Sequence, residues 1–242
     1  MQRRTLLAAL AVAPFISRAL AEAPDYQMRL ISDAKATTFG LHIKLAKGWK
    51  TYWRVPGEAG IPPQVKIESP NIESAEILYP LPQRLLDDSG EAIGYHDEVV
   101  FILKPKRTAA ATNGGKLQGN LHAFLGVCQI ICKPVKYDAE LASAITDDAT
   151  LNKFLERLPS PANFVNEAEQ ADKSLELTLT QKVDDIFIDG PDSLYFRKPE
   201  FTTNIARFKI DGLQEGQSLK GVSLRITAVT KGKGLEQTIA IT

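Results

Sequence analysis

Alternation of apolar and polar residues dominates most of the chain. In FGLHIKL, residues 39–45, apolar side chains occupy every second position, and His42 and Lys44 between them are expected to face solvent. A period of two over short segments predicts half-buried strands. Similar runs occur at 98–103, 117–124, 175–180, 208–210 and 223–229. Stretches rich in Gly and Pro separate the runs, as turns do, so the pattern predicts a mostly β protein built as a sandwich.

One segment follows a helical period instead. Its apolar residues are three or four positions apart: Leu151, Phe154, Leu155 and Leu158. Asp147 or Asp148 can cap the start of this helix, and Pro159 ends it. The polar stretch that follows shows no clear period. We therefore predict a leader over 1–21, a first β domain over 22–145, a helix and linker over 146–173, and a second, smaller β domain over 174–242.

The leader has the three parts of a secretory signal peptide. Arg3 and Arg4 are followed by an apolar run over 5–16 that is too short to span a bilayer, and then by the small-x-small sequence at 19–21. The arginines suit either the Sec or the twin-arginine route; an uncleaved anchor is the alternative. No later run approaches the ~18 apolar residues of a membrane helix. We expect a soluble periplasmic protein, in a compartment where disulfides can form.

Charge narrows the choice of partners. The chain has 29 basic and 29 acidic residues, and loss of Arg3, Arg4 and Arg18 with the leader turns the balance slightly acidic. A surface that binds phosphate groups is basic. We therefore predict no nucleic-acid partner.

Both cysteines of the chain lie in FLGVCQIICKP, residues 124–134. In an extended strand Cys128 and Cys132 would be roughly 13 Å apart, whereas a disulfide needs Cα atoms within about 4.4–6.8 Å. A bonded pair therefore requires the chain to turn back. So short a loop gives only about 2 kcal/mol of stability, and short-loop disulfides are often labile. A redox-active disulfide, a structural disulfide and a pair of metal ligands remain open.

Four stretches occur in one order along the chain: GWKTYWRVPGEAGIPP (48–63), YPLPQR (79–84), GYHDEVVF (94–101) and VCQIICKP (127–134). Together they resemble the amino-terminal periplasmic domain of the thiol:disulfide interchange protein DsbD. Relatives of the ScsB type are the most similar, because their two cysteines are also separated by three residues. The resemblance covers roughly residues 26–144. It implies that the first β domain, 22–145, is an immunoglobulin-like sandwich.

The resemblance also implies an activity, that of a thiol:disulfide oxidoreductase without a bound cofactor. A membrane-embedded thiol reductase would donate electrons to the pair, which would pass them to periplasmic thioredoxin-like or disulfide-isomerase-like proteins. Only Cys128 and Cys132 carry over as catalytic residues, and Cys132 is expected to attack the partner. The chain shows neither membrane helices after the leader nor a CxxC motif. A separate reductase is therefore expected to supply the electrons; the alternative is that the domain has another task.

Aromatic residues concentrate in the first domain. Five of them could shield the sulfurs: Trp49, Tyr52, Trp53, Tyr95 and Phe124. Trp53, Tyr95 and Phe124 are the main candidates for shielding and for contacting a partner. Ordinary core packing is the alternative, because large aromatic side chains fill the interior of any sandwich.

Two other functions use the same sulfurs. With His96 and His122, the cysteines could bind Cu(I) or Zn(II), although His122 lies roughly 20 Å from Cys128 along an extended strand. For each histidine, a surface or hydrogen-bonded role is the alternative. The third function is a non-catalytic β-sandwich interaction domain with an inert disulfide.

Overall fold

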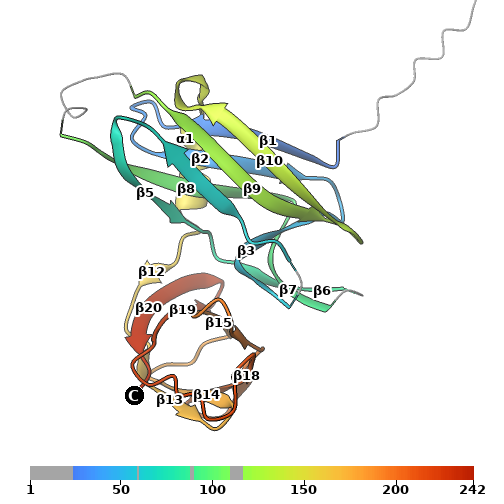
Figure 1. Ribbon diagram of the computed structural model, residues 1–242, viewed down its shortest axis with the longest axis vertical. Coiled ribbons are helices and arrows are strands. Elements are labelled where there is room, and N and C mark those ends of the chain that lie inside the picture. The colour runs from blue at the N-terminus through green and yellow to red at the C-terminus, as the bar shows by residue number, and fades with distance from the viewer. Residues whose placement is uncertain (1–23, 59, 88–89, 110–116) are drawn as a thin grey trace, which may run out of the picture.

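Two β-sandwiches, joined in sequence by a short helix, make up the molecule (Figure 1). The structure is a computed structural model, and it describes residues 24–58, 60–87, 90–109 and 117–242. The predicted mostly β fold is confirmed. The predicted signal peptide, residues 1–21, lies outside the described residues.

The first sandwich packs two sheets face to face. Sheet one has the order β11-β1-β2-β8-β5, with strands β11 (Ile145–Thr146), β1 (Tyr26–Ser32), β2 (Phe39–Leu45), β8 (Glu98–Arg107) and β5 (Ile72–Leu78). Sheet two has the order β10-β9-β3-β7-β6, and β4 also pairs with β9; its strands are β10 (Cys132–Glu140), β9 (Asn120–Cys128), β3 (Lys50–Gly57), β7 (Gly90–His96), β6 (Gln83–Asp87) and β4 (Gln64–Glu68). The pairs are antiparallel except β1 with β11.

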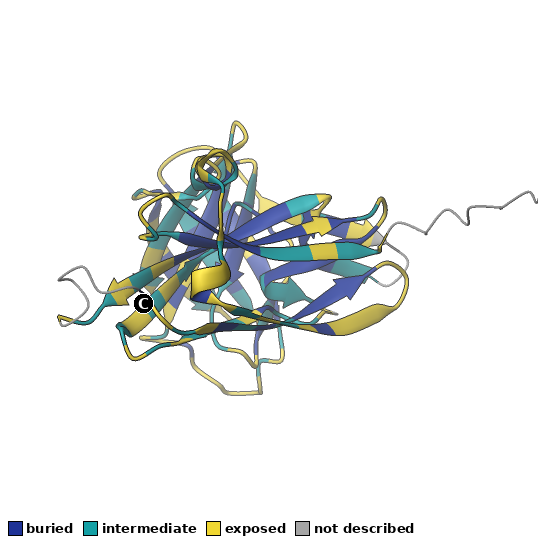
Figure 2. Cartoon of the chain, turned by 90° about the horizontal axis from the view of Figure 1, so that it is seen from above, coloured by how far each residue is buried: buried dark blue, intermediate teal, exposed yellow. Residues whose placement is uncertain are grey.

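Inward-facing residues of both sheets form the first core. Alternate positions of β2, β8 and β9 supply much of it, including Leu41, Phe101 and Leu125, none of which is exposed. Figure 2 shows buried positions along the strands and exposed positions in the loops. The two-residue period therefore selects the buried face as the sequence predicts.

The predicted helix is confirmed as α1 (Asp148–Leu155), which follows the 3-10 turn η1 (Leu141–Ser143). Asp147 caps α1, because its side chain accepts a hydrogen bond from the backbone N–H of Thr150 at 3.0 Å. Leu151 and Phe154 pack on the outer face of sheet one, against a small cluster formed by Ile31, Val100 and Ile102.

His42 departs from the expectation that it faces solvent, because it is buried at the outer face of sheet one. Arg29 Nε donates a hydrogen bond to His42 Nδ1 at 2.8 Å, so His42 Nε2 carries the proton and donates to Glu98 at 2.7 Å. Lys153 of α1 pairs with Glu98, and Arg29 pairs with the helix cap Asp147. The alternation placed His42 on the correct face, but it could not show that this face is covered.

The second sandwich also has two sheets. One has the order β12-β20-β19-β15, with strands β12 (Ser160–Pro161), β20 (Lys233–Ala240), β19 (Ser223–Thr230) and β15 (Asp185–Asp189). The other has the order β13-β14-β18-β16, and β17 also pairs with β18; its strands are β13 (Val165–Ala171), β14 (Ser174–Leu179), β18 (Ile205–Asp211), β16 (Tyr195–Phe196) and β17 (Glu200–Phe201). A separate apolar core lies between them.

Part of the predicted linker belongs to this second sandwich. The stretch 160–173 was expected to be irregular, yet it contains β12 and β13. The pairing of β13 with β14 shifts register between Val165 and Glu167. A bulge of this kind interrupts the two-residue period, so buried Val165 and Ala168 are three positions apart and hide the strand from a pattern search.

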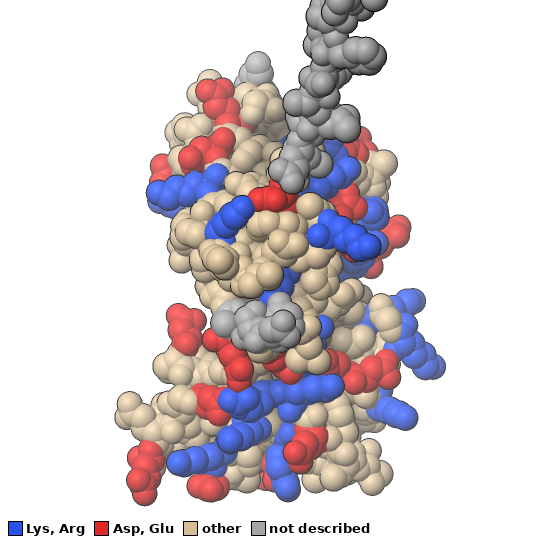
Figure 3. Space-filling model, turned by 90° about the vertical axis from the view of Figure 1, so that its right-hand side faces the viewer, with Lys and Arg blue, Asp and Glu red and all other residues tan. Residues whose placement is uncertain are grey.

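The two sandwiches share an apolar contact. Phe187 of β15 is buried in the core of the first sandwich, where its ring and that of Trp53 form a T-shaped pair with centroids 5.8 Å apart. On the face in Figure 3, basic and acidic side chains are interspersed over both sandwiches.

Candidate functional site

Cys128 and Cys132 form a disulfide at the end of the β9–β10 hairpin. They are directly opposite each other in the antiparallel ladder, with Cα atoms 4.1 Å apart, and residues 129–131 make the turn. The chain thus turns back between them, as a bonded pair requires. The last ladder position of β9 and the first of β10 hold the two sulfurs.

The two cysteines differ in exposure. Cys128 is 1% exposed, whereas Cys132 is among the exposed residues of the hairpin end. The alternation of β9 explains why Cys128 is not part of the main core. Val127 points into that core, so Cys128 lies on the outer face of sheet two. There Cys128 forms its own buried cluster with Tyr52, Leu85 and Ala92. Cys132 is therefore the more accessible of the two cysteines.

Tyr52 of β3 contacts both sulfurs. Its hydroxyl oxygen lies 2.9 Å from Cys128 Sγ and 3.0 Å from Cys132 Sγ. Sulfurs joined in a disulfide carry no hydrogen, so the tyrosine O–H is the donor. Gly126 permits this approach, since a Cβ there would lie only 3.1 Å from the Tyr52 ring and 2.9 Å from Ile61 Cβ. Tyr52 is one of the aromatic residues that the sequence offers for shielding, whereas nothing in the sequence points to Gly126.

A lysine adjoins the pair in the sheet. Lys50 of β3 is the register partner of Cys128 on one side and of His96 on the other, and it is only 4% exposed. Register partners point to the same face of a sheet. Lys50 and Cys128 are therefore ladder neighbours on the outer face of sheet two.

The hairpin turn is apolar and exposed. Ile130 is 87% exposed and Ile131 is 76% exposed, directly between the two cysteines. Single exposed apolar residues are normal on a protein surface, but two at a turn are unusual because turns favour Gly, Pro, Asn, Asp and Ser. The two adjacent isoleucines are visible in the sequence QII, residues 129–131, where a bond between the cysteines requires a turn.

Comparison with known proteins agrees with this geometry. The family model described as "Thiol:disulfide interchange protein DsbD, N-terminal" matches residues 17–144. The chain belongs to the DsbD amino-terminal domain family. The crystal structure of the N-terminal periplasmic domain of ScsB from Proteus mirabilis is similar to it, with a TM-score of 0.68 and 20% sequence identity over 89% of this chain and 92% of that chain. At that identity the likeness shows a shared fold, and it extends over both sandwiches.

No curated protein matches the chain in sequence. Within the described residues, no helix has both the length and the apolar character needed to cross a membrane.

Among the aromatic residues predicted to shield the sulfurs, Tyr52 contacts both of them, whereas others lie in the core of this DsbD-type sandwich. Trp53 and Tyr95 belong to the core between the sheets, where the Tyr95 hydroxyl donates to the carbonyl oxygen of Pro80 at 2.8 Å. They are thus separate from the cluster around Cys128, and their positions favour the core-packing alternative. Phe124 is half-buried on the outer face of β9 and lines a hollow with His122.

The histidines considered as metal ligands are apart from each other. His96 of β7 is the register partner of Lys50, and its Nδ1 lies 3.2 Å from the carbonyl oxygen of Trp49. His122 is paired with Asp138 at 2.6 Å, six residues before Cys128 in β9. Among the described residues, no group of three or more His, Cys, Asp and Glu side chains is placed to hold a metal ion.

Proposed function

We propose that this chain is a periplasmic thiol–disulfide exchange module of the DsbD type. Cys128 and Cys132 accept two electrons from a membrane-embedded thiol reductase and deliver them to thioredoxin-like or disulfide-isomerase-like proteins of the periplasm. The difference in exposure between the two sulfurs carries the proposal, because exchange requires one accessible sulfur and one that is held nearby.

The delivery step begins with the reduced pair. The thiolate of Cys132 attacks one sulfur of the partner's disulfide, and the partner's other sulfur leaves as a thiolate. Cys128, as a thiolate, then attacks Cys132 Sγ, reforms the disulfide and releases the partner with two reduced cysteines. Two electrons pass to the partner, and the protons released by the pair balance those taken up by the partner's thiolates.

The surroundings of Cys128 suit the second attack. Its thiolate would accept a hydrogen bond from the Tyr52 hydroxyl and would lie beside buried Lys50. Both interactions favour the charged form of the sulfur. The ladder keeps Cys128 opposite Cys132, so the resolving sulfur acts at high effective concentration.

The exposed turn supplies a contact for a protein partner. Ile130 and Ile131 project beside Cys132, where a partner's own cysteine must approach. Burial of one such side chain contributes roughly 1.5–3 kcal/mol. A small thiol reagent cannot use this contact, because it has no complementary apolar surface.

The main experiment equilibrates the oxidised protein with glutathione redox buffers and then offers the reduced protein an oxidised thioredoxin-like protein with one CxxC pair. We expect a potential in the range of exchange proteins, between about −120 and −270 mV, and reduction of the partner. A disulfide that no glutathione ratio reduces would refute the proposal and leave the non-catalytic interaction domain.

Single-cysteine variants test the assigned roles. Cys128→Ala leaves the exposed sulfur and should accumulate a mixed disulfide with the thioredoxin-like protein, whereas Cys132→Ala should not. An Ile130→Ser, Ile131→Ser variant should slow exchange with that protein but react with dithiothreitol at the wild-type rate. Equal trapping by both cysteine variants would contradict the roles given to the two sulfurs.

A further inference from the structure

The β6–β7 hairpin of the first sandwich has two faces with different neighbours. Alternate residues of paired strands point to opposite sides. Leu85 and its register partner Ala92 face the site, where they are buried against Tyr52 and Cys128. Arg84, which precedes Leu85 in β6, and Glu91, which precedes Ala92 in β7, point to the other face.

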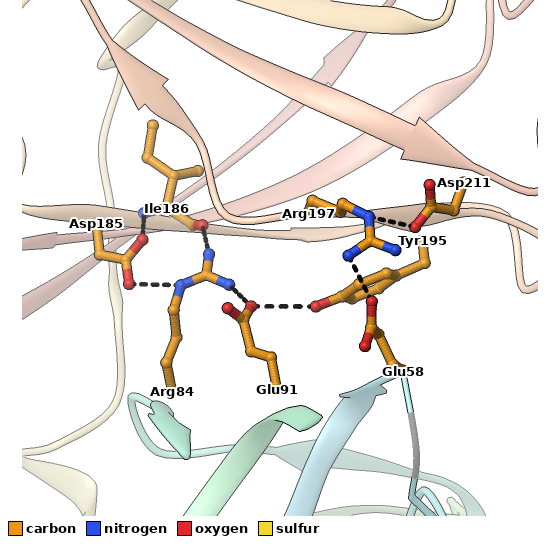
Figure 4. A network of polar contacts seen from close by, with 8 residues as sticks. All are labelled: Glu58, Arg84, Glu91, Asp185, Ile186, Tyr195, Arg197 and Asp211. Atoms are coloured by element: carbon orange, nitrogen blue, oxygen red, sulfur yellow. Dashed lines mark hydrogen bonds and ion pairs between the residues drawn. The ribbon is translucent and has the colours of Figure 1, made fainter. Parts of the chain in front are cut away.

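That other face is bound by the second sandwich (Figure 4). The Arg84 side chain is 8% exposed; its Nε donates to Asp185 at 2.8 Å and its Nη2 donates to the carbonyl oxygen of Ile186 at 2.9 Å. Arg84 also pairs with Glu91, and Glu91 accepts a hydrogen bond from the Tyr195 hydroxyl at 3.1 Å.

Two further contacts extend this attachment. The guanidinium of Arg84 lies 5.0 Å from the ring centroid of Phe187, a cation–π distance. Glu58, at the end of β3, pairs with Arg197 at 2.6 Å, and Arg197 is held in turn by Asp211 at 2.6 Å. Figure 1 shows the β6–β7 and β9–β10 hairpins at the same end of the first sandwich, with the second sandwich below and to the left of β6 and β7.

We propose that the second sandwich holds the β6–β7 hairpin against the disulfide and so controls how readily thiols react with Cys128 and Cys132. Arg84 is then a positioning residue, since it contacts neither sulfur and acts through its neighbour Leu85. This inference rests on the proposed exchange function and gives the second sandwich a part in it. Any change that weakens the contact between the two sandwiches should then raise the rate at which thiols react with the disulfide.

The chain offers a matched pair of carboxylates for a test. Asp185 and Asp189 lie at the two ends of β15, and each accepts a hydrogen bond from the Nε of an arginine in the first sandwich. Asp185 binds Arg84 of the hairpin at 2.8 Å, whereas Asp189 binds Arg54 of β3 at 2.7 Å. Both contacts cross the same interface, and only the first reaches the hairpin.

The experiment measures the rate at which dithiothreitol reduces the disulfide in the full chain carrying Asp185→Ala or Asp189→Ala. Loss of one partly buried ion pair should raise the population of the open hairpin, and with it the reduction rate of Asp185→Ala, about fivefold. Asp189→Ala should stay near the wild-type rate. Thermal unfolding of each variant verifies that both sandwiches are folded.

A second variant avoids the loss of charge. Tyr195→Phe removes only the hydroxyl that binds Glu91, so it should change the rate in the same direction by a smaller factor. Unchanged rates in both Asp185→Ala and Tyr195→Phe would overturn the inference. Equal acceleration in Asp185→Ala and Asp189→Ala would also overturn it, because the hairpin would then have no special part.

The two proposals fail in different ways. Dithiothreitol is a strong reductant, so the comparison of variants can be made even if glutathione leaves the wild-type disulfide intact. Wild-type resistance to glutathione would refute the exchange function alone. A wild-type protein that exchanges normally, with variants that match it, would refute only the role given to the second sandwich.

Discussion

Removal of the Tyr52 hydroxyl tests the chemistry of the site most directly. In Tyr52→Phe the ring remains in the cluster with Cys128, and only the donor at 2.9 and 3.0 Å from the two sulfurs is lost. The hydroxyl binds neutral sulfur in the oxidised protein; in the proposed exchange it would bind the Cys128 thiolate of the reduced protein. The variant should therefore destabilise the reduced protein more than the oxidised protein.

The size of the effect follows from this difference. A hydrogen bond to a charged group contributes about 1.5–3 kcal/mol, against about 0.5–1.5 kcal/mol for a neutral pair. The difference is about 1–2 kcal/mol, which corresponds to about 20–45 mV for a two-electron couple. The reduction potential of Tyr52→Phe should become more negative by that amount.

The assay is equilibration of each variant in glutathione or dithiothreitol buffers, with the free thiols counted after acid quenching. Tyr95→Phe is the matched control, because it removes a hydroxyl that donates to the carbonyl oxygen of Pro80 inside the core. That variant should lose about 1 kcal/mol of folding stability and keep the wild-type potential. An unchanged potential in Tyr52→Phe, or an equal shift in Tyr95→Phe, would refute the reasoning.

Two further predictions concern the frame around the site. Burial lowers the pKa of His42 in the folded protein below its usual 6.5. Between the folded and unfolded pKa values the unfolded chain binds more protons, so the free energy of unfolding should fall as pH drops below about 6.5. Urea titrations at pH 7.5 and 5.5 should show this loss in the wild type and in His122→Gln, but not in His42→Gln. Phe187→Ala removes a buried ring that packs on Trp53 and should cost about 3–5 kcal/mol; a smaller loss in thermal unfolding would mean that the contact between the sandwiches contributes little.

The sequence predicted the features that depend on local pattern. The two-residue period predicted the strands. A bond between Cys128 and Cys132 required the chain to turn back, and the structure shows that this turn is a hairpin. The same reasoning also located the helix start, since Asp147, one of the two candidate caps, caps α1. Local spacing and capping chemistry determine each of these features, so one sequence is enough to find them.

Features that depend on how elements meet were missed. Nothing in the alternation of β2 shows that α1 and its ion pairs bury the face of His42. Aromatic composition likewise could not separate Tyr52, which faces the sulfurs, from its neighbour Trp53, which faces the core. Adjacent strand residues point to opposite sides, so the choice between them depends on knowing which face of sheet two carries the disulfide.

An irregularity in β3 explains how one strand serves both the disulfide and the second sandwich. The pairing of β3 with β7 is regular as far as Tyr52 and resumes only at Gly57, after three extra residues on β3. Extra residues in one strand bend it and redirect its side chains. Tyr52 therefore stays against the sulfurs while Arg54, two positions later, reaches Asp189 and Glu236 of the second sandwich. Since the β6–β7 hairpin is held from the same side, the second sandwich contacts two of the elements that enclose Cys128.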